Sequence, residues 1–161
     1  MSNEVSTNNV IDIKIGGIGR KRFRINGDDN MIISLDTSDF NIVTRLEKSY
    51  NELQELCSQA VKKLSGTKEE AENFSETAEV LSELNDKMKK IIDYIFDSDV
   101  CSVCVGNAAL YDITETGELR FETIIMCLCG LYEDAIKKNS EKMIGRFKAH
   151  TAKYTENAKK K

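Results

Sequence analysis

Apolar and polar residues alternate near the start of the chain, as they do in a strand with one buried face. The alternation runs through "VIDIKI" from Val10 and returns in "KRFRI", where Phe23 and Ile25 share one face. Next, "NGDDN" supplies residues that tolerate left-handed backbone angles before the apolar "MIISLD". The pattern predicts a small antiparallel β-hairpin over about residues 10–36, preceded by a disordered terminus at residues 1–9.

From residue 38 onward, apolar residues recur every three or four positions, which places them on one side of a helix. Three such segments are predicted, and Thr37 or Ser38 can cap the first. The predicted fold class is mainly α, a helical bundle of three to five helices with the N-terminal hairpin on one edge (α+β). The apolar stripes contain Phe40, Val43, Leu46, Tyr50, Leu53, Cys57, Ala60 and Leu64; Phe74, Leu81, Leu84, Met88, Ile91, Ile92, Ile95 and Phe96; and Phe121, Ile124, Ile125, Leu128, Leu131, Tyr132 and Ala135.

The end of the chain carries a sparser stripe, which includes Phe147 and Tyr154. We therefore expect a single domain at residues 10–138, with the bundle at about residues 38–138, and a basic C-terminal helix or tail at residues 139–161. Apolar residues on an otherwise polar helix have no obvious internal use. Phe147 and Tyr154 are therefore candidates for contact with a partner.

The composition is that of a soluble globular chain. Of the 161 residues, 40% are hydrophobic and 31% are charged. No apolar run approaches the roughly 20 residues of a membrane span, and the polar start lacks a secretory signal. We expect a cytoplasmic protein without membrane association, whose five cysteines are free thiols.

Charge is distributed unevenly along the chain. Residues 1–27 carry a net charge of +3, residues 28–136 carry −14, and residues 137–161 carry +7. An acidic body repels nucleic acid, whereas a basic tail is available to an acidic partner. The simpler interpretation is that charged helices and a frayed terminus are well solvated.

Two groups of basic residues are candidates for partner binding. Arg22 and Arg24 flank an aromatic residue in the hairpin, and Arg146 and Lys148 flank Phe147 in the tail. Such groups can contact phosphates, but the acidic body disfavours nucleic acid as the partner. Arg22 and Arg24 also fit an edge strand that charge protects from aggregation.

The C-x-x-C at Cys101 and Cys104 could bind metal, perform redox chemistry or only pack. Structural zinc needs four converging ligands, but Cys127 and Cys129 lie two apart in a helical pattern and point roughly 200° apart. A redox pair usually begins a helix after a βαβ unit, whereas this motif follows a helix. We expect it to close that helix and enter the core, which leaves Cys101 and Cys104 as weak metal candidates.

The other candidates for catalysis or phosphate binding, His150 and the "GGIG" segment, lack the neighbouring residues that such chemistry needs. His150 is the single histidine, and its neighbours Lys148, Thr151 and Lys153 provide no apolar wall to tune its pKa. The "GGIG" segment lacks the Lys-Ser/Thr of a phosphate loop and leads into a strand. The sequence therefore predicts a protein that is not an enzyme and needs no cofactor.

The strands, helices and C-x-x-C described above follow one another in a distinctive order over about residues 30–137. Two segments are the most distinctive. One is "IDYIFDSDVCSVCVG", which ends at Gly106, and the other runs from Phe121 through an apolar helix to Tyr132. This order resembles a family of small tail-module proteins, similar to the tail assembly chaperones of phages of Gram-positive bacteria. The C-x-x-C and the long basic tail depart from the family pattern.

The resemblance implies a non-enzymatic phage protein in the host cytoplasm that binds the tape-measure or tail-tube protein during virion assembly. An amphipathic bundle can lend apolar surface to partner helices while charged flanks keep the complex dissolved. Homo-oligomers are compatible with such a role. The residues leave open an alternative, a small acidic phage inhibitor of a host defence protein that acts by surface or nucleic-acid mimicry.

Overall fold

The structure is a computed structural model that describes residue 13 and residues 19–65 and 74–159. Within these residues the chain is mainly helical, with a two-stranded antiparallel sheet near the N-terminus, which confirms the predicted fold class. The predicted disordered terminus and most of the first predicted strand lie outside the described residues. The elements in chain order are β1 (Lys21–Arg24), β2 (Ile32–Leu35), α1 (Asn41–Ser65), α2 (Phe74–Phe96), α3 (Cys101–Cys104) and α4 (Arg120–Lys159).

The hairpin forms where the sequence predicts it. Phe23 pairs with Ile33 in the antiparallel register, so apolar residues of the two strands lie opposite each other. Asn26 and Gly27 both have positive φ angles, 53° and 71°, as the turn between the strands requires. The Ser98 hydroxyl donates a hydrogen bond to the Ser34 carbonyl at 2.8 Å and fixes the hairpin to the segment after α2.

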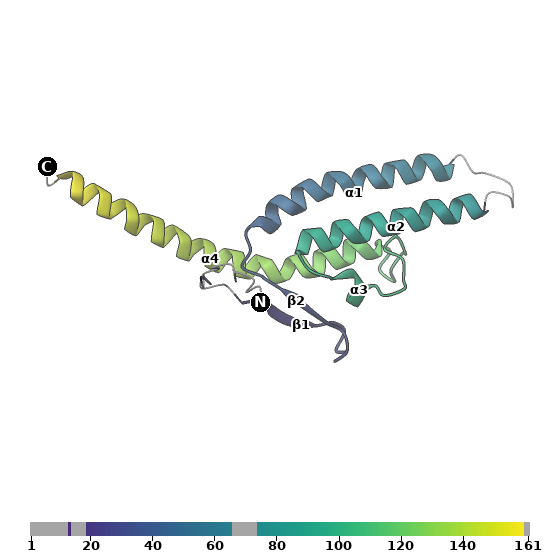
Figure 1. The fold of residues 1–161 in the computed structure, drawn as a ribbon, viewed down its shortest axis with the longest axis horizontal. Coiled ribbons are helices and arrows are strands. Elements are labelled where there is room, and N and C mark those ends of the chain that lie inside the picture. Colours follow the sequence, from purple (N-terminus) through teal and green to yellow (C-terminus); the bar gives the residue numbers. More distant parts are fainter. Residues whose placement is uncertain (1–12, 14–18, 66–73, 160–161) are drawn as a thin grey trace, which may run out of the picture.

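α1 and α2 run antiparallel and pack along their length (Figure 1). The residues of α1 that face the core alternate in steps of four and three, which is the spacing of a coiled-coil seam. Ser49 is completely buried on this seam and, being small, permits a close approach of the neighbouring helix. The core-facing residues of α1 are Ile42, Leu46, Ser49, Leu53, Leu56 and Ala60.

The structure differs from the predicted first helix in two respects, the exposure of two apolar residues and the identity of the N-terminal cap. Val43 and Tyr50 belong to the predicted buried stripe, but each is 58% exposed. The cap of α1 is Asp39, whose carboxylate accepts a hydrogen bond from the Asn41 backbone N–H at 2.9 Å. The predicted cap Ser38 instead bonds the side chain of Asp36. Because Val43 and Tyr50 are exposed, the apolar residues of α1 cover more than one face of the helix, and some of them face outward.

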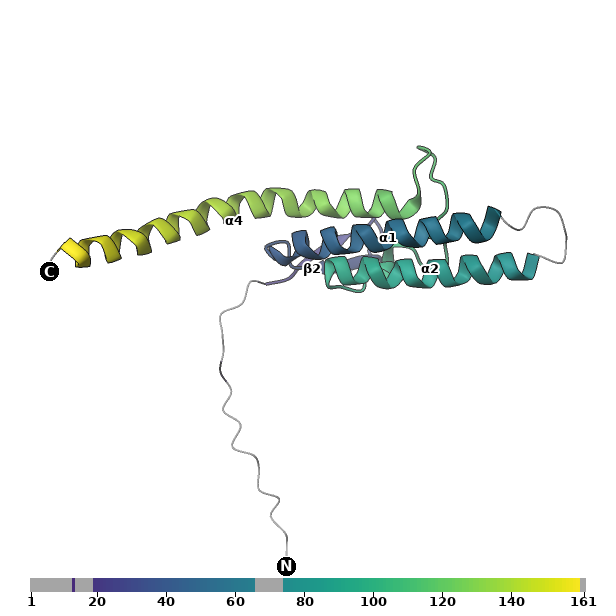
Figure 2. The same cartoon turned by 90° about the horizontal axis from the view of Figure 1, so that it is seen from above.

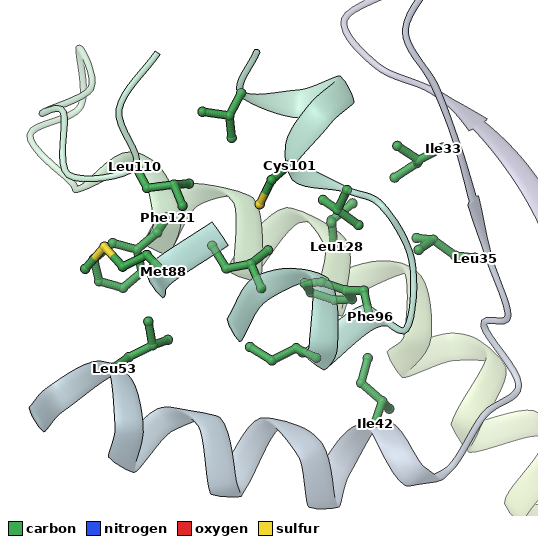
Figure 3. Packing of buried hydrophobic residues seen from close by; sticks show 14 of the residues in the cluster. Ile33, Leu35, Ile42, Leu53, Met88, Phe96, Cys101, Leu110, Phe121 and Leu128 are labelled. Carbon is green, nitrogen blue, oxygen red and sulfur yellow. The ribbon is translucent and has the colours of Figure 1, made fainter. Parts of the chain in front are cut away.

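The core is formed by α1, α2, the start of α4 and the inner face of β2 (Figure 3). Phe96 at the end of α2 lies 6.0 Å from Tyr132 of α4, measured between ring centroids. Burial raises the pKa of Tyr132 to about 12, so its hydroxyl stays protonated. The labelled core residues are Ile33, Leu35, Ile42, Leu53, Met88, Phe96, Cys101, Leu110, Phe121 and Leu128.

α4 is a single helix of 40 residues. Its first half packs on the body, whereas its second half extends well beyond the other elements in both views (Figures 1 and 2). The predicted division between domain and tail, at residues 138 and 139, falls inside this uninterrupted helix. We call residues 139–159 the overhang.

Candidate functional site

The C-x-x-C forms α3, a single helical turn that follows α2 after a short connection. The Asp93 carboxylate of α2 accepts hydrogen bonds from the backbone N–H groups of Val100 and Cys101, each at 2.9 Å. The Cys101 thiol is buried and lies 3.6 Å from the Lys89 carbonyl, to which it donates. As expected, Cys101 enters the core, but the prediction that the motif closes the second helix is wrong, because α2 ends at Phe96 and Cys101–Cys104 form a separate helical turn.

This environment opposes thiolate formation. Burial raises the pKa of the Cys101 thiol well above its ordinary range, and the negative charge of Asp93 raises it further. The pKa of Cys104 is raised by the same two causes. A thiolate is the form that binds metal or attacks a substrate, so these surroundings do not activate either cysteine.

No third ligand accompanies the two cysteines in the part of the chain that the structure describes. No group of three or more His, Cys, Asp and Glu side chains gathers there in a way that could hold a metal ion. Of the other residues that could ligate zinc, Cys127 and the single histidine, His150, are exposed on α4, and Cys129 is half-buried. Of the weak metal candidates, Cys101 is buried in the core and Cys104 is half-buried against it.

The structure separates the two predicted groups of partner-binding residues. Arg22 and Arg24 lie exposed on β1, where Arg24 forms an ion pair with Asp29. Arg146 and Lys148 lie on the overhang, which extends away from the body and its hairpin (Figure 1). The two groups therefore do not form one surface.

The overhang carries an exposed apolar stripe that includes the predicted partner-binding residue Phe147. Phe147 is 62% exposed, and Met143 and Ile144 on the same side are also exposed. A shallow depression along this side is lined by Ile144, Phe147 and Lys148. Tyr154 lies on the same helix, and its side chain is outside the described part.

A groove lies between α1 and the first half of α4, with a volume of about 830 Å³. Its apolar walls come from two helices that run antiparallel (Figure 2). We call it the α1/α4 groove. It is lined by Leu46, Tyr50, Leu53, Gln54 and Cys57 of α1, by Phe121, Glu122, Ile125 and Met126 of α4, and by Glu118 and Leu119 just before α4.

Large apolar side chains stand exposed along this groove. Tyr50 is 58% exposed and Met126 is 65% exposed. Leu46, Tyr50, Leu53 and Cys57 step by four, three and four residues, so they form a second stripe on α1 that overlaps the buried seam. The exposed apolar side chains of this groove make it a candidate interaction surface.

The groove has an acidic end. Glu118 and Glu122 line it, and the Glu122 carboxylate accepts a hydrogen bond from the Leu119 N–H at 2.9 Å, which fixes it at the start of α4. Burial raises the pKa of the Cys57 thiol, and the negative charge of Glu122 raises it further. The thiol of Cys57 thus contributes apolar lining beside a fixed carboxylate.

Sequence reasoning missed this groove because it assigned the stripe with Val43, Tyr50 and Cys57 to the core and left Ile42 and Leu56, which do face the core, out of that stripe. The signal was present, because the stripe through Val43, Tyr50 and Cys57 cannot share one narrow face with the stripe through Ile42 and Ser49. Two overlapping stripes on one helix indicate two apolar neighbours. The monomer covers one of these stripes, and the other is left at the groove.

Comparisons with protein-family models, with curated proteins and with solved structures give no match to this chain. None of the described helices has the length and apolar character to cross a membrane. The resemblance to tail assembly chaperones therefore remains a prediction from the sequence.

Proposed function

We propose that the protein is a phage tail assembly chaperone whose α1/α4 groove binds an amphipathic helix of the tape-measure or tail-tube protein. The observation that carries the proposal is the groove itself. It presents large exposed apolar side chains from two long helices, with acidic residues at one end. The proposed activity is binding, without chemical change of the partner.

The shape of the groove favours a helix over other ligands. Helix-in-groove recognition places residues three or four positions apart into an elongated apolar channel. Leu46, Tyr50, Leu53 and Cys57 form one wall along α1, while Ile125 and Met126 belong to the opposite wall on α4. A helix laid between these walls would add the missing neighbour to the second stripe of α1 and complete a four-helix arrangement.

The charge of the site specifies the partner helix further. Glu118 and Glu122 would face basic residues beside the apolar stripe of the partner. Because residues 28–136 carry a net charge of −14, the complex would keep a strongly charged surface while apolar residues of the partner are covered. Solubility of the partner is therefore the expected outcome of binding.

Coexpression with the tape-measure protein tests the proposal. We expect the wild-type chain to increase the soluble fraction of that protein, and the double variant Tyr50→Glu, Met126→Glu to lose this effect, since it places two charges in the apolar groove. Phe74→Glu is the matched control, because Phe74 is 79% exposed at the far end of α2 and does not line the groove. The proposal fails if the double variant and Phe74→Glu preserve solubility equally.

Recovery of native complexes from infected cells distinguishes the alternative function. Tape-measure or tail-tube protein bound to the chain supports the chaperone. A host nuclease bound to the acidic body in place of a tail protein, and held equally by the groove variant, contradicts it and supports an inhibitor.

A further inference from the structure

α4 carries two stripes of residues, one that faces the core and one that leads from the α1/α4 groove onto the overhang. We infer that the partner helix proposed for the groove continues past the body and lies along the overhang, so that one helix of at least about 26 residues contacts both. The inference rests on the proposed function and specifies the length and the charge pattern of its partner.

The first stripe of α4 belongs to the core. Phe121, Leu128 and Tyr132 are all buried and lie within about 40° of one another around the helix axis, counting 100° per residue. None of the described side chains of α4 beyond Tyr132 is buried. The body therefore stops covering α4 after this residue.

The second stripe lies roughly 80° around α4 from the first. Its members are half-buried or exposed, and they follow at steps of three, four or seven residues, which is the spacing of a coiled-coil seam. They are Met126, Cys129, Ile136, Ser140, Met143 and Phe147. Glu133 occupies the remaining position of this spacing and is exposed. The stripe begins in the groove, which Met126 lines, and continues onto the overhang.

One partner helix can follow the whole of the second stripe. α4 is a single helix from Arg120 to Lys159, so the groove and the overhang lie along one helix (Figures 1 and 2). Two helices that pack through seam spacing supercoil around each other and stay in contact along their length. Glu122 in the groove and Phe147 on the overhang are 25 positions apart, which corresponds to about 38 Å of helix. This distance sets the minimum length of the partner helix.

The overhang presents the apolar surface that such a partner needs. Met143, Ile144 and Phe147 are 40%, 49% and 62% exposed. The Thr151 hydroxyl donates to the Phe147 carbonyl at 2.9 Å, so this polar group beside the stripe is bonded within the helix. Helices gain most of their stability from packing of an apolar face. A partner along the stripe would therefore also stabilise the overhang.

Charge distinguishes the two ends of the partner helix. Arg146 and Lys148 lie on either side of Phe147, and residues 137–161 carry a net charge of +7. Glu118 and Glu122 lie at the groove end. The partner helix should therefore carry acidic residues beside its apolar stripe at the overhang, and basic residues about 25 positions away at the groove.

A protein helix fits this face better than a membrane surface does. A helix that lies in a membrane surface buries a broad apolar face and carries basic residues on its polar face. The described overhang instead has three large exposed apolar side chains with seam spacing. Its exposed residues also include Glu141 and Glu156, which an anionic surface repels.

Photocrosslinking from two positions of α4 tests whether one helix contacts both sites. A photoreactive phenylalanine analogue replaces Met126, Phe147 or Ala149 in separate variants, each coexpressed in turn with the tape-measure and the tail-tube protein. We expect positions 126 and 147 to crosslink to one segment of one protein, at sites about 21 residues apart. Position 149, on the opposite face of α4, should give at least tenfold less product. Crosslinks from 126 and 147 to unrelated segments, or a lack of crosslinks from 147, overturn the inference.

Phe147→Glu distinguishes failure of this inference from failure of the proposed function. It places a charge on the exposed stripe and leaves the groove intact. We expect it to lower the soluble fraction of the coexpressed tail protein at least threefold, whereas Ala149→Glu should leave that fraction unchanged. If the double variant Tyr50→Glu, Met126→Glu loses the effect but Phe147→Glu keeps it, the groove acts alone and the spanning helix is wrong. If neither variant changes solubility, the proposed function fails as well.

Sedimentation with phosphatidylglycerol vesicles tests the membrane alternative. We expect the wild-type chain and Phe147→Glu to sediment with the vesicles to the same extent, because the stripe does not enter lipid. At least tenfold more vesicle-bound wild type than Phe147→Glu would show that the stripe binds a membrane surface, and would overturn the inference.

Discussion

The Asp93 carboxylate on α2 and the Cys101 backbone N–H on α3 are joined by a hydrogen bond of 2.9 Å. The same oxygen accepts the N–H of Val100, so one carboxylate satisfies two donors at the start of α3. The C-x-x-C is thus held in place by a negative charge beside its first thiol. This contact favours the protonated thiol, whereas metal binding and redox chemistry use the thiolate.

Thiol reactivity should follow this environment. In native protein at pH 8, we expect exposed Cys127 to be alkylated by iodoacetamide first and buried Cys101 last, by at least tenfold in rate. Because the pKa of Cys101 is raised, its rate should not level off between pH 8 and 10 as that of an ordinary thiol does. Mass spectrometry of peptides after timed alkylation measures each rate.

Asp93→Ala provides the matched test. Removing the carboxylate leaves two N–H groups without their acceptor and removes a negative charge beside Cys101. We expect a loss of stability of about 1 to 2 kcal/mol and faster alkylation of Cys101. Unchanged stability together with unchanged alkylation would show that the Asp93 contact is unimportant.

A second contact makes the start of α1 sensitive to acid. Asp39 caps α1 and lies 2.8 Å from Arg45 Nη2, while Arg45 Nε donates to the Ile95 carbonyl at 2.8 Å. Burial alone would raise the pKa of Asp39, but the hydrogen bonds and charge of Arg45, with the N–H of Asn41, lower it below its ordinary value. The pair therefore stabilises the fold above the pKa of an unfolded aspartate, about 4, and this contribution is lost as the pH falls through the lower folded value.

Asp39→Asn isolates this effect, because asparagine also caps helices but carries no charge. We expect it to lose about 1 kcal/mol at pH 7, measured by urea unfolding, and to show a smaller fall in stability than wild type between pH 5 and pH 2. Parallel pH profiles for the two proteins would mean that the Asp39 charge does not contribute.

Gly145 tests whether α4 must be continuous. It lies in the middle of the overhang, and a Cβ at this position would meet nothing within 4 Å. Gly145→Ala should stabilise the helix by about 1 kcal/mol and raise its circular dichroism signal, whereas Gly145→Pro should cost about 3 kcal/mol and break the helix there. The proline variant should therefore have a weaker helical circular dichroism signal than wild type; an unchanged signal would contradict a continuous α4 through residue 145.

Much of the fold could be predicted from local patterns. Three predicted features depend only on neighbouring residues, and the structure has all three. They are the alternation through Phe23, the Asn26–Gly27 turn and the apolar stripe from Leu84 to Phe96. The end of the predicted domain at residue 138 could not be fixed in the same way. Helical spacing continues through it, so the pattern alone cannot show where the body stops covering α4.

The candidate site was harder to predict because it depends on contacts between distant segments. Phe147, Arg146 and Lys148 were identified from their neighbours and lie on one exposed helix. Tyr50 and Met126 are 76 residues apart in the sequence and meet at one groove only through the packing of α1 and α4 around α2. Residues with the spacing of a core are left exposed where none of the described helices covers them.

Site-specific photocrosslinking at position 126 tests the central claim most directly. A photoreactive phenylalanine analogue in place of Met126, in cells that make the phage tail proteins, should crosslink to a helix of the tape-measure or tail-tube protein, and the same analogue at position 74 should not. Crosslinks at position 74 but not at 126, or crosslinks at 126 only to proteins unrelated to the tail, would contradict the assignment of the α1/α4 groove as the partner site.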